Sequence, residues 1–381
     1  MKKLLLGLFV LFMSVAAHAA DYRAALVADM DTGRVLISEN ANQPNYPASL
    51  TKIMTLYLTF DALEHGRLHL DDYLIVSQNA AAAAPVKLGL VAGSKIRVED
   101  AITALAVYSA NDVARVLAEN LKGGKEGTFA SLMTRVAREI GLSQTNFENS
   151  SGLPDDDHLS TARDIALLSM AVYRHFPQYW HFFGIKTWVY NGKTYTNGNR
   201  LLETYPGCDG MKTGYTNKSK YSLVATAARG GRRLISVVLG AEDKDVRAAV
   251  STRMLNRGFE MLNVNSPIAA TNAAPKNTVV PAPVTSPIVQ KYADDAPRVT
   301  QTYAPAPVAT GGVGVQFGAF SNMDSAKSMA ARVQNALGAN AHVEPNGTGL
   351  YRVRVNGLSE VAAQDLKNRA TGAGIDCYVF H

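Results

Sequence analysis

The chain has 381 residues, of which 47% are hydrophobic and 18% are charged, and its formal net charge is +6. This composition supports one large globular core and a smaller second one, and it excludes a chain that is disordered throughout. A basic excess is compatible with anionic polymers, membrane surfaces or nucleic acid. No cluster of Lys and Arg is interleaved with aromatic residues, which argues against nucleic acid.

The first residues have the layout of a secretory leader. Lys2-Lys3 is followed by an apolar run from Leu4 to Val15 and by the small residues of Ala17-His18-Ala19. The run is shorter than the roughly 20 apolar residues that a spanning helix needs. We therefore predict a signal peptide at residues 1–19, export to the periplasm, and no transmembrane anchor.

A change of composition divides the mature chain. Residues 266–310 hold eight of the fifteen prolines, and proline-rich chain of this length extends to on the order of 100 Å. We predict a linker there, between folded parts at residues 20–265 and 311–381. The only two cysteines, Cys208 and Cys377, lie far apart, so the fold does not depend on a disulfide framework.

The larger part begins and ends with a predicted β-hairpin. The first pairs residues 24–27 with 35–37, and the second pairs 222–228 with 234–240 around Gly230-Gly231. Between them, helical patterns cover residues 50–64, 98–107, 112–121, 129–140 and 161–173. A sheet built from both chain ends, with a helical lobe inserted, would bring early and late residues into one cleft.

The smaller part has the order β-α-β-β-α-β. Strands are predicted at residues 313–320, 341–344, 350–355 and 375–380, and helices at 323–337 and 359–371. This order gives an antiparallel sheet with both helices on one face. The other face is then free to bind a ligand.

Ser49 and Lys52 are placed one turn apart at the start of the first long helix, directly after Pro47. A buried lysine near a helix N-terminus is pushed toward its neutral form, and a neutral amine can activate a serine hydroxyl. The alternative is a serine N-cap followed by a surface lysine. The apolar residues that follow on nearly every side of the helix weaken that alternative.

Two further elements accompany this pair. Ser109-Ala110-Asn111 interrupts two helical patterns, and Lys212-Thr213-Gly214 precedes the second hairpin. The order Ser-x-x-Lys, Ser-x-Asn, Lys-Thr-Gly is the set found in penicillin-binding proteins and class A β-lactamases. Ser77-Gln78-Asn79 also fits the second element, but the apolar helices on both sides of Ser109 favour that position.

The larger part resembles the low-molecular-mass penicillin-binding proteins, the serine D-alanyl-D-alanine carboxypeptidases. The resemblance includes residues 47–54, 108–112, 149–153, 199–202 and 209–216. It implies an α/β catalytic domain with an antiparallel sheet and a helical lobe, which needs neither metal nor cofactor. It also implies peptidoglycan stem peptides as substrates and β-lactam antibiotics as inhibitors.

The resemblance also implies a role for each motif residue. Ser49 is then the nucleophile, Lys52 the general base and Ser109 a proton relay to the leaving amine, while Asn111 positions the substrate amide. In the third motif, Lys212 and Thr213 bind the terminal carboxylate of the substrate, and Gly214 lets the strand approach the substrate. The backbone N–H groups of Tyr215 and Ser49 together form an oxyanion hole. Relatives often have histidine at position 215, so a side-chain role for Tyr215 is in doubt.

Other candidates have simpler explanations. Asp155-Asp156-Asp157-His158 looks like a metal-ligand cluster, but adjacent side chains on a loop rarely converge, and a solvated turn is favoured. Cys208 would share a strand face with Lys212, yet nothing indicates a thiolate. Arg200 fits a substrate carboxylate and a surface ion pair about equally well.

The smaller part resembles a SPOR domain through residues 315–320 and 351–355. In that family the sheet binds peptidoglycan glycan strands without stem peptides, at division septa. The resemblance makes Gln316, Tyr351, Arg352 and Arg354 candidate glycan contacts, against the alternative of ordinary cross-strand pairing. We expect this domain and its tether to replace the anchoring helix of other carboxypeptidases.

Three other functions compete with carboxypeptidase. A D,D-endopeptidase would use the same residues to cut cross-links. A class A β-lactamase would need a carboxylate to activate water, for which the candidates are Glu119, Glu126, Glu139 and Glu148. A wall-binding adaptor would have an inactive catalytic part, which the intact motifs disfavour.

Overall fold

The computed structural model describes residues 21–264, 313–320, 323–345, 351–373, 375 and 377–380. The chain divides into two compact units, Met1–Thr300 and Gln301–His381, and each is described by itself. The predicted leader and the predicted linker lie outside the described residues.

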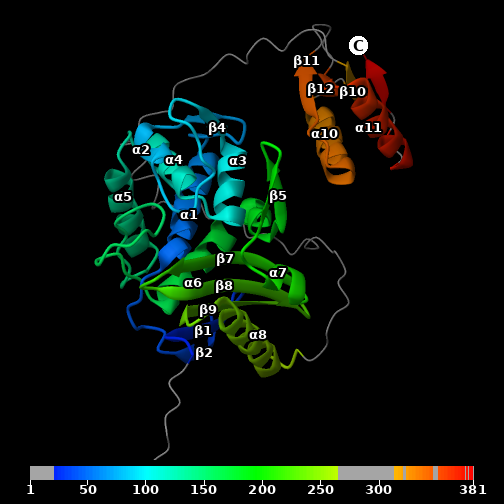
Figure 1. The fold of residues 1–381 in the computed structure, drawn as a ribbon. Helices are drawn as coiled ribbons and strands as arrows, with labels where there is room; N and C mark the ends of the chain where they lie inside the picture. Colours follow the sequence, from blue (N-terminus) through cyan, green and yellow to red (C-terminus); the bar gives the residue numbers. More distant parts are fainter. Residues whose placement is uncertain are drawn as a thin grey trace, which may run out of the picture. The chain divides into compact units, whose positions relative to one another are not determined.

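A five-stranded antiparallel sheet forms the base of the first unit (Figure 1). Its strand order is β2-β1-β9-β8-β7. The strands are β1 (Ala24–Asp29), β2 (Val35–Glu39), β7 (Cys208–Thr216), β8 (Lys220–Arg229) and β9 (Arg232–Ala241). The first and last parts of the catalytic region thus pair directly through β1 and β9, which confirms the predicted sheet from both chain ends.

Both faces of this sheet are covered. One face packs against α8 (Lys244–Met261), and the other packs against α6 (Ala162–His175). All six residues of β1 are buried as a result, namely five small or apolar residues and Asp29. Strands covered on both faces read as continuous apolar runs rather than as alternating ones.

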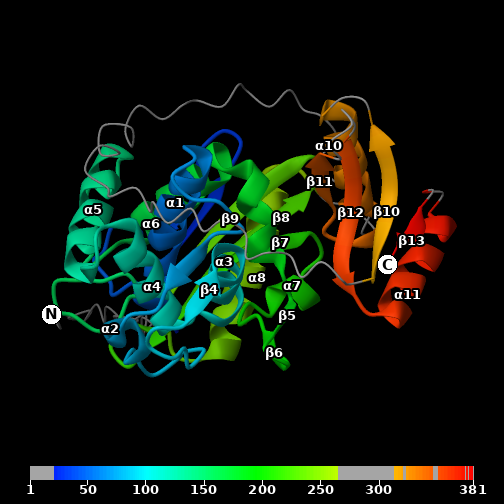
Figure 2. The ribbon, with the colours of Figure 1, turned by 90° about the horizontal axis from the view of Figure 1, so that it is seen from above.

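The helical lobe is built around α1 (Lys52–Glu64). This helix contacts α4 (Asn111–Leu121), α5 (Glu126–Glu139) and α6 (Figure 2), and every residue from Lys52 to Leu63 is buried. A helix that is apolar on nearly all sides can be accommodated only in such a central position. The buried surroundings of Lys52 follow from this placement.

Two predicted helices differ from the observed ones at functionally important ends. The first helix is preceded by a turn of 3-10 helix, η1 (Ala48–Thr51), which contains Ser49. The predicted helix at 98–107 is α3 (Val98–Thr103) followed by a π-helical turn, η2 (Ala104–Tyr108). Ser109 ends that turn with a left-handed backbone conformation, φ 68° and ψ 33°.

Several elements were missed by the sequence analysis. They are α2 (Gln78–Ala81), α7 (Leu201–Thr204), the 3-10 helix η3 (Pro177–Gly184), the two-stranded sheet of β3 (Tyr73–Ile75) and β4 (Lys95–Arg97), that of β5 (Thr187–Tyr190) and β6 (Lys193–Thr196), and α8. The longest, α8, carried a readable signal. Asp243 caps its N-terminus, and Val250, Met254 and Leu255 form a buried stripe.

The second unit has the predicted element order. Its elements are β10 (Val313–Phe320), α10 (Met323–Leu337), β11 (His342–Pro345), β12 (Tyr351–Leu358), α11 (Glu360–Gly372) and β13 (Tyr378–Phe380), with the antiparallel strand order β11-β12-β10-β13. Both helices share one core with the sheet. In the described part of the whole chain, no helix combines the length and apolar character needed to cross a bilayer.

Candidate active site

Ser49 and Lys52 meet where η1 passes into α1. The Lys52 amine lies 2.9 Å from the Ser49 hydroxyl oxygen, as the one-turn spacing predicts. Lys52 has no exposed surface, whereas Ser49 is only half-buried. The nucleophile candidate is thus accessible from one side, and the amine behind it is closed off from solvent.

Two further contacts orient the Lys52 amine. It donates to the side-chain oxygen of Asn111 at 2.8 Å and to the backbone carbonyl of Ser151 at 2.7 Å. Both partners are acceptors only, so a neutral amine uses its two N–H bonds on them. Its lone pair then points at the Ser49 hydroxyl, which is the orientation that general-base catalysis requires.

The surroundings also favour the neutral amine. Burial holds the pKa of Lys52 well below its ordinary value, and the nearby cation Lys212 lowers it further, while Glu126 acts in the opposite direction. Burial likewise lowers the pKa of Lys212 to about 7, with Arg247 as the second cause. Removing charged groups from water disfavours their charged forms, and here two lysines are affected together.

Asn111 is fixed at the start of α4. Its side-chain amide donates to the Ala84 carbonyl at 3.2 Å, which leaves its oxygen directed at Lys52. Ser109, two residues earlier, has a buried hydroxyl with no hydrogen-bond partner among the described residues. The left-handed turn at Ser109 ends the π-helical segment, so this hydroxyl is presented from a bend rather than from a helix face.

The third motif lies on β7, the edge strand of the sheet. Lys212 is almost fully buried, and its amine donates to the Thr213 carbonyl at 3.1 Å. Arg247 from α8, which the sequence analysis missed, is also buried and donates to the carbonyls of Ser222 and Gly198 at 3.4 Å. Two cations are therefore concentrated beside this strand edge.

Two glycines allow the backbone segments of the site to approach each other. A Cβ on Gly214 would lie 3.0 Å from the Pro47 carbonyl oxygen and 3.3 Å from the Ser49 nitrogen. A Cβ on Gly152 would lie 1.7 Å from the Ala48 carbonyl oxygen, and Gly152 also has φ +81°. Gly214 thus lets β7 approach the turn that carries Ser49. This is a packing role, whereas the sequence analysis gave Gly214 only a role in the approach of the substrate.

Tyr215 directs its side chain away from this backbone approach. It is 49% exposed, and its hydroxyl donates to the Asn217 side-chain oxygen at 3.0 Å. Its ring lies against that of Tyr221, with 4.3 Å between the centroids. The Tyr215 side chain therefore lies at the surface of the strand and has its own partners there.

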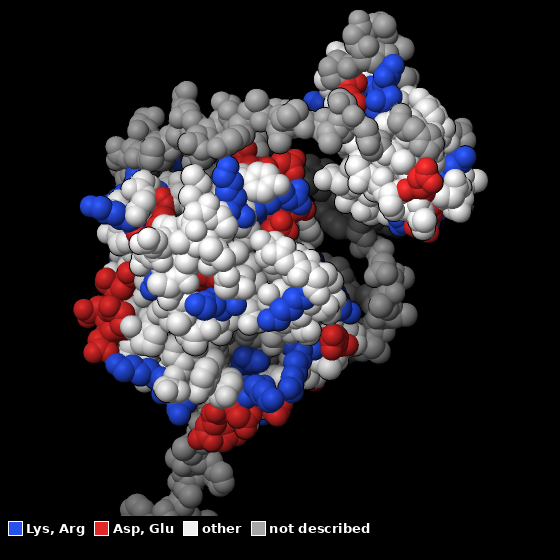
Figure 3. Space-filling model, turned by 45° about the horizontal axis from the view of Figure 1, so that its top comes forward, with Lys and Arg blue, Asp and Glu red and all other residues white. Residues whose placement is uncertain are grey.

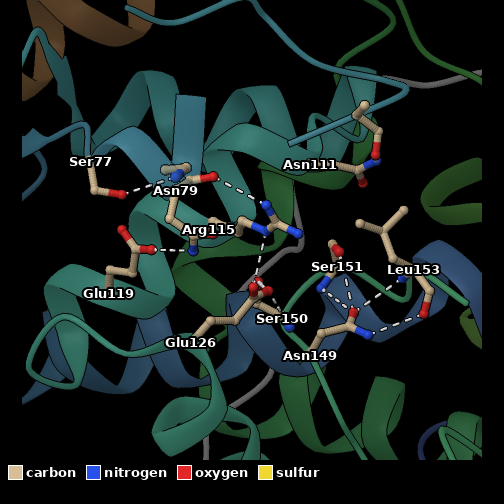
Figure 4. A network of polar contacts seen from close by, with 12 residues as sticks. Ser77, Asn79, Asn111, Arg115, Glu119, Glu126, Asn149, Ser150, Ser151 and Leu153 are labelled. Carbon is tan, nitrogen blue, oxygen red and sulfur yellow. Dashed lines mark hydrogen bonds and ion pairs between the residues drawn. The ribbon is translucent and has the colours of Figure 1, made fainter. Parts of the chain in front are cut away.

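A loop at residues 149–153, also missed as a site element, supplies the Ser151 carbonyl that accepts from Lys52. Figure 4 shows the hydrogen bonds within this loop. The Asn149 side-chain oxygen accepts hydrogen bonds from the backbone N–H groups of Ser151, Gly152 and Leu153 at 3.2, 2.7 and 3.1 Å. This compact turn presents the Ser151 carbonyl to the amine. The sequence marked the segment only through its resemblance to the family.

The acidic cluster before His158 does not converge, and among the described residues no group of side chains is arranged to hold a metal. Asp155, Asp156 and Asp157 are exposed, and Asp156 pairs with Lys218. His158 is buried instead, which corrects the prediction of a solvated turn.

The partners of His158 define its tautomer. The backbone N–H of Glu148 donates to its Nδ1 at 3.3 Å, so its Nε2–H donates to the Thr51 hydroxyl at 2.8 Å. Burial lowers the pKa of His158 to about 4. The neutral ring therefore connects the loop to η1, directly beside the Ser49 turn.

Cys208 and Lys212 do not share a face, contrary to the spacing argument. The register of β7 shifts between Cys208 and Gly210, which breaks the alternation of side chains. Cys208 packs with the core on the α8 side, while Lys212 is paired with Val224 of the opposite core. Burial raises the pKa of the Cys208 thiol to about 11, which keeps it protonated.

Arg200 and Ser77 have structural partners. Arg200 forms an ion pair with Asp245 at 2.6 Å, with more than half of its side chain exposed. The Ser77 hydroxyl accepts from the Ala80 N–H at 2.9 Å and so caps α2. Asn111, rather than Asn79, is the asparagine that contacts Lys52.

The β-lactamase alternative needs an available carboxylate. Glu126, which influences Lys52, is already engaged by Ser150 and Arg115, and Glu148 accepts from the Asn146 side chain at 2.6 Å. Glu119 accepts from the Asn79 side chain at 2.7 Å. Each of these three carboxylates has a structural contact, although the second oxygen of Glu119 is buried with no partner among the described residues.

In the second unit, three of the four candidate glycan contacts lie on the sheet face away from the helices, although one of them, Gln316, is only 5% exposed. Gln316 and Arg354 are paired across strands and joined by a 2.7 Å hydrogen bond, and Arg352 follows the same alternation. Tyr351 instead packs against the core under the helices, because alternation turns it away from the open face.

The open face also carries two aromatic residues that the sequence analysis missed. Tyr378 is paired with Gln316 across the sheet and is 50% exposed. The Phe380 ring lies 4.3 Å from the Arg354 guanidinium. The face therefore combines cationic and aromatic groups.

Comparison with known proteins assigns both units. Residues 12–243 match the D-alanyl-D-alanine carboxypeptidase family, and residues 309–380 match the SPOR domain. The chain is 35% identical to D-alanyl-D-alanine carboxypeptidase DacF of Bacillus subtilis over 257 residues, which are 65% of this chain and 64% of DacF. It is 37% identical to DacC of Escherichia coli over 262 residues, 67% of this chain and 65% of DacC.

Solved structures give the same result. Penicillin-binding protein 5 from Haemophilus influenzae is similar with a TM-score of 0.61 and 32% identity, over 65% of this chain and 73% of that one. Penicillin-binding protein D2 from Listeria monocytogenes, solved in an ampicillin-bound form, gives 0.58 and 31% over 63% and 98%. The chain matches just under two thirds of the length of the two curated relatives. It belongs to the D-alanyl-D-alanine carboxypeptidase family and carries a SPOR domain after the catalytic region.

Proposed function

We propose that this protein is a serine D-alanyl-D-alanine carboxypeptidase that trims peptidoglycan stem peptides. The observation that carries the proposal is the buried Lys52 amine, held by Asn111 and the Ser151 carbonyl so that its lone pair faces the Ser49 hydroxyl. This arrangement activates a serine and has no evident purpose in a wall-binding adaptor.

The reaction proceeds through an ester on Ser49. Lys52 accepts the hydroxyl proton as Ser49 Oγ attacks the carbonyl carbon, and the N–H groups of Ser49 and Tyr215 bind the oxyanion. Ser109 relays that proton from Lys52 to the departing D-alanine nitrogen as the C–N bond breaks, which returns Lys52 to its neutral form. Water then attacks the ester carbonyl carbon as Lys52 removes one of its protons, and Lys52 returns that proton to Ser49 Oγ as the ester bond breaks. A β-lactam acylates the same hydroxyl.

Recognition of the substrate rests on cations at the β7 edge. The terminal carboxylate is bound by Lys212 and the Thr213 hydroxyl, in a field to which the buried Arg247 contributes. Arg247 replaces Arg200 in this proposal, because Arg200 is already paired with Asp245 at the surface. Asn111 positions the amide of the stem peptide.

The SPOR domain supplies the second half of the proposed function. Gln316, Arg352 and Arg354, together with Tyr378 and Phe380, are proposed to bind denuded glycan and so to recruit the exported enzyme to septal wall in the periplasm. Aromatic rings stack on sugar rings, and cationic side chains donate hydrogen bonds to sugar hydroxyls. Binding through these contacts does not need a high net charge on the domain. Figure 3 shows acidic and basic side chains intermixed on the face in view.

The test uses purified full-length protein with labelled penicillin and, separately, with a pentapeptide ending in D-Ala-D-Ala. We expect a covalent adduct and release of D-alanine, both lost in Ser49→Ala. Wild-type protein that gives neither product would refute the proposal. Digestion of cross-linked muropeptides distinguishes carboxypeptidase from endopeptidase, and hydrolytic turnover of penicillin would indicate a β-lactamase instead.

A further inference from the structure

A chain of polar contacts leads from α4 and α5 to the loop that holds the Lys52 amine (Figure 4). Glu126 is the first residue of α5, and one of its carboxylate oxygens accepts from the Ser150 backbone N–H at 3.1 Å and the Ser150 hydroxyl at 2.6 Å. Its other oxygen is 3.0 Å from the guanidinium of Arg115 on α4. Both side chains are largely buried at this junction.

Ser150 is held from a second side. Its carbonyl accepts from the Thr55 hydroxyl on α1 at 2.6 Å, and the next carbonyl, that of Ser151, accepts from the Lys52 amine at 2.7 Å. Glu126 and Thr55 therefore fix the backbone one residue before the contact that consumes an N–H of Lys52. A shift of Ser150 would be transmitted directly to that contact.

We propose that Glu126, braced by Arg115, is a positioning residue for acyl transfer, which fixes Ser150 so that the Ser151 carbonyl keeps the Lys52 lone pair aimed at Ser49. This inference rests on the proposed function and adds a residue to which the sequence motifs assign no such role. The carboxylate touches neither the serine nor the substrate. It acts through the loop.

A simpler explanation is that Glu126 only stabilises α5. An acidic residue in the first turn interacts favourably with the helix dipole, and this effect requires no partner in the loop. It does not account for two hydrogen bonds to Ser150 or for the buried pairing with Arg115. Such a paired carboxylate holds both neighbours in a defined geometry.

The charge of Glu126 gives a separate signature. The charged groups that act on Lys52 from neighbouring elements are Lys212 on β7 and Glu126 on α5. His158, on the loop beside η1, is the titratable group whose own pKa Lys52 lowers. Burial and Lys212 lower the pKa of Lys52, and Glu126 raises it. Loss of the carboxylate therefore lowers that pKa further, even as it loosens the loop.

The experiment measures the rate of acylation by labelled penicillin as a function of pH in full-length wild type, Glu126→Ala and Glu126→Gln. For Glu126→Ala we expect the plateau rate to fall about tenfold, as for a misoriented base, and the acidic limb to move to lower pH. Glutamine keeps an acceptor for Ser150 but not the charge, so Glu126→Gln should show a smaller fall and a similar shift. Glu260→Gln, on α8 and paired with Arg257, is the matched control and should change neither quantity.

A purely structural role predicts another result. Glu126→Ala would then lower only the fraction of protein that can be acylated, with the rate and pH profile of the remainder unchanged, and this outcome would overturn the inference. Crystal structures of wild type and Glu126→Ala give a readout independent of acylation. We expect the contact between Lys52 and the Ser151 carbonyl to lengthen, and an unchanged contact would also overturn the inference. Absence of acylation in wild type would count against the proposed function alone.

Discussion

The two units use cationic side chains in opposite ways. In the catalytic unit Lys52 and Lys212 are buried, and burial lowers the pKa of both. A nearby cation adds to the effect in each case, Lys212 for Lys52 and Arg247 for Lys212. In the SPOR domain Arg352 and Arg354 lie partly exposed on an open sheet. The formal positive charge of Lys52 thus gives way to a neutral proton acceptor, while that of the two arginines is permanent.

The difference follows from desolvation and from residue type. A lysine that loses its hydration shell is driven toward the neutral amine, while a guanidinium keeps its proton in nearly every protein environment. A proton acceptor beside Ser49 therefore needs to be a lysine that is closed off from solvent. A surface that binds a ligand through permanent charge is better served by arginine with access to solvent.

The strongest test of this comparison replaces Lys52 with arginine. The guanidinium cannot release a proton, so acylation by labelled penicillin should fall by at least about 1000-fold in stopped-flow measurements. Lys52→Met should lose a similar amount, since it removes the base without adding charge. Lys244→Arg, at an exposed position, is the control. A rate for Lys52→Arg within tenfold of wild type would mean that another group is the base.

A second test concerns the buried neutral ring of His158. Its pKa is about 4 when folded and 6.5 ordinarily, so the unfolded chain binds the extra proton between these values. Stability is therefore lost as the pH falls from 6.5 toward 4, by up to about 3 kcal/mol from this residue. Urea unfolding followed by tryptophan fluorescence is selective, because both tryptophans, Trp180 and Trp188, lie in the catalytic unit.

His158→Gln should show a shallower loss of stability with falling pH than wild type. The exposed His69→Gln should keep the wild-type slope. Parallel slopes for wild type and His158→Gln would contradict the assignment of a neutral, buried His158.

The smallest expected effect is in the SPOR domain. Arg352→Ala combined with Arg354→Ala should weaken binding to amidase-treated sacculi by about tenfold, because the hydrogen bonds from the two guanidinium groups to the glycan are lost. Penicillin acylation should be unchanged. Lys327→Ala, on an exposed position of α10, should bind normally. Equal binding of wild type to untreated sacculi would contradict recognition of denuded glycan.

Much of the architecture was readable from the sequence. The hairpins at both ends of the catalytic region, five helical segments and the β-α-β-β-α-β order depend on local periodicity, and they were confirmed. Short elements such as α7 and the β5–β6 hairpin were missed, because a few residues carry little periodic signal. The register shift beside Cys208 could not be predicted from the sequence either, because it depends on how β7 pairs with β8.

The sequence by itself determined the motif set and the proximity of Ser49 and Lys52, because one helical turn places those side chains together whatever the rest of the fold does. Only the tertiary structure decided that the Ser151 carbonyl and Asn111 would consume the N–H bonds of Lys52, and that Glu126 would hold the loop. These partners come from segments up to 99 residues away. Their meeting depends on the packing of α1, α4 and α5, which no local pattern encodes.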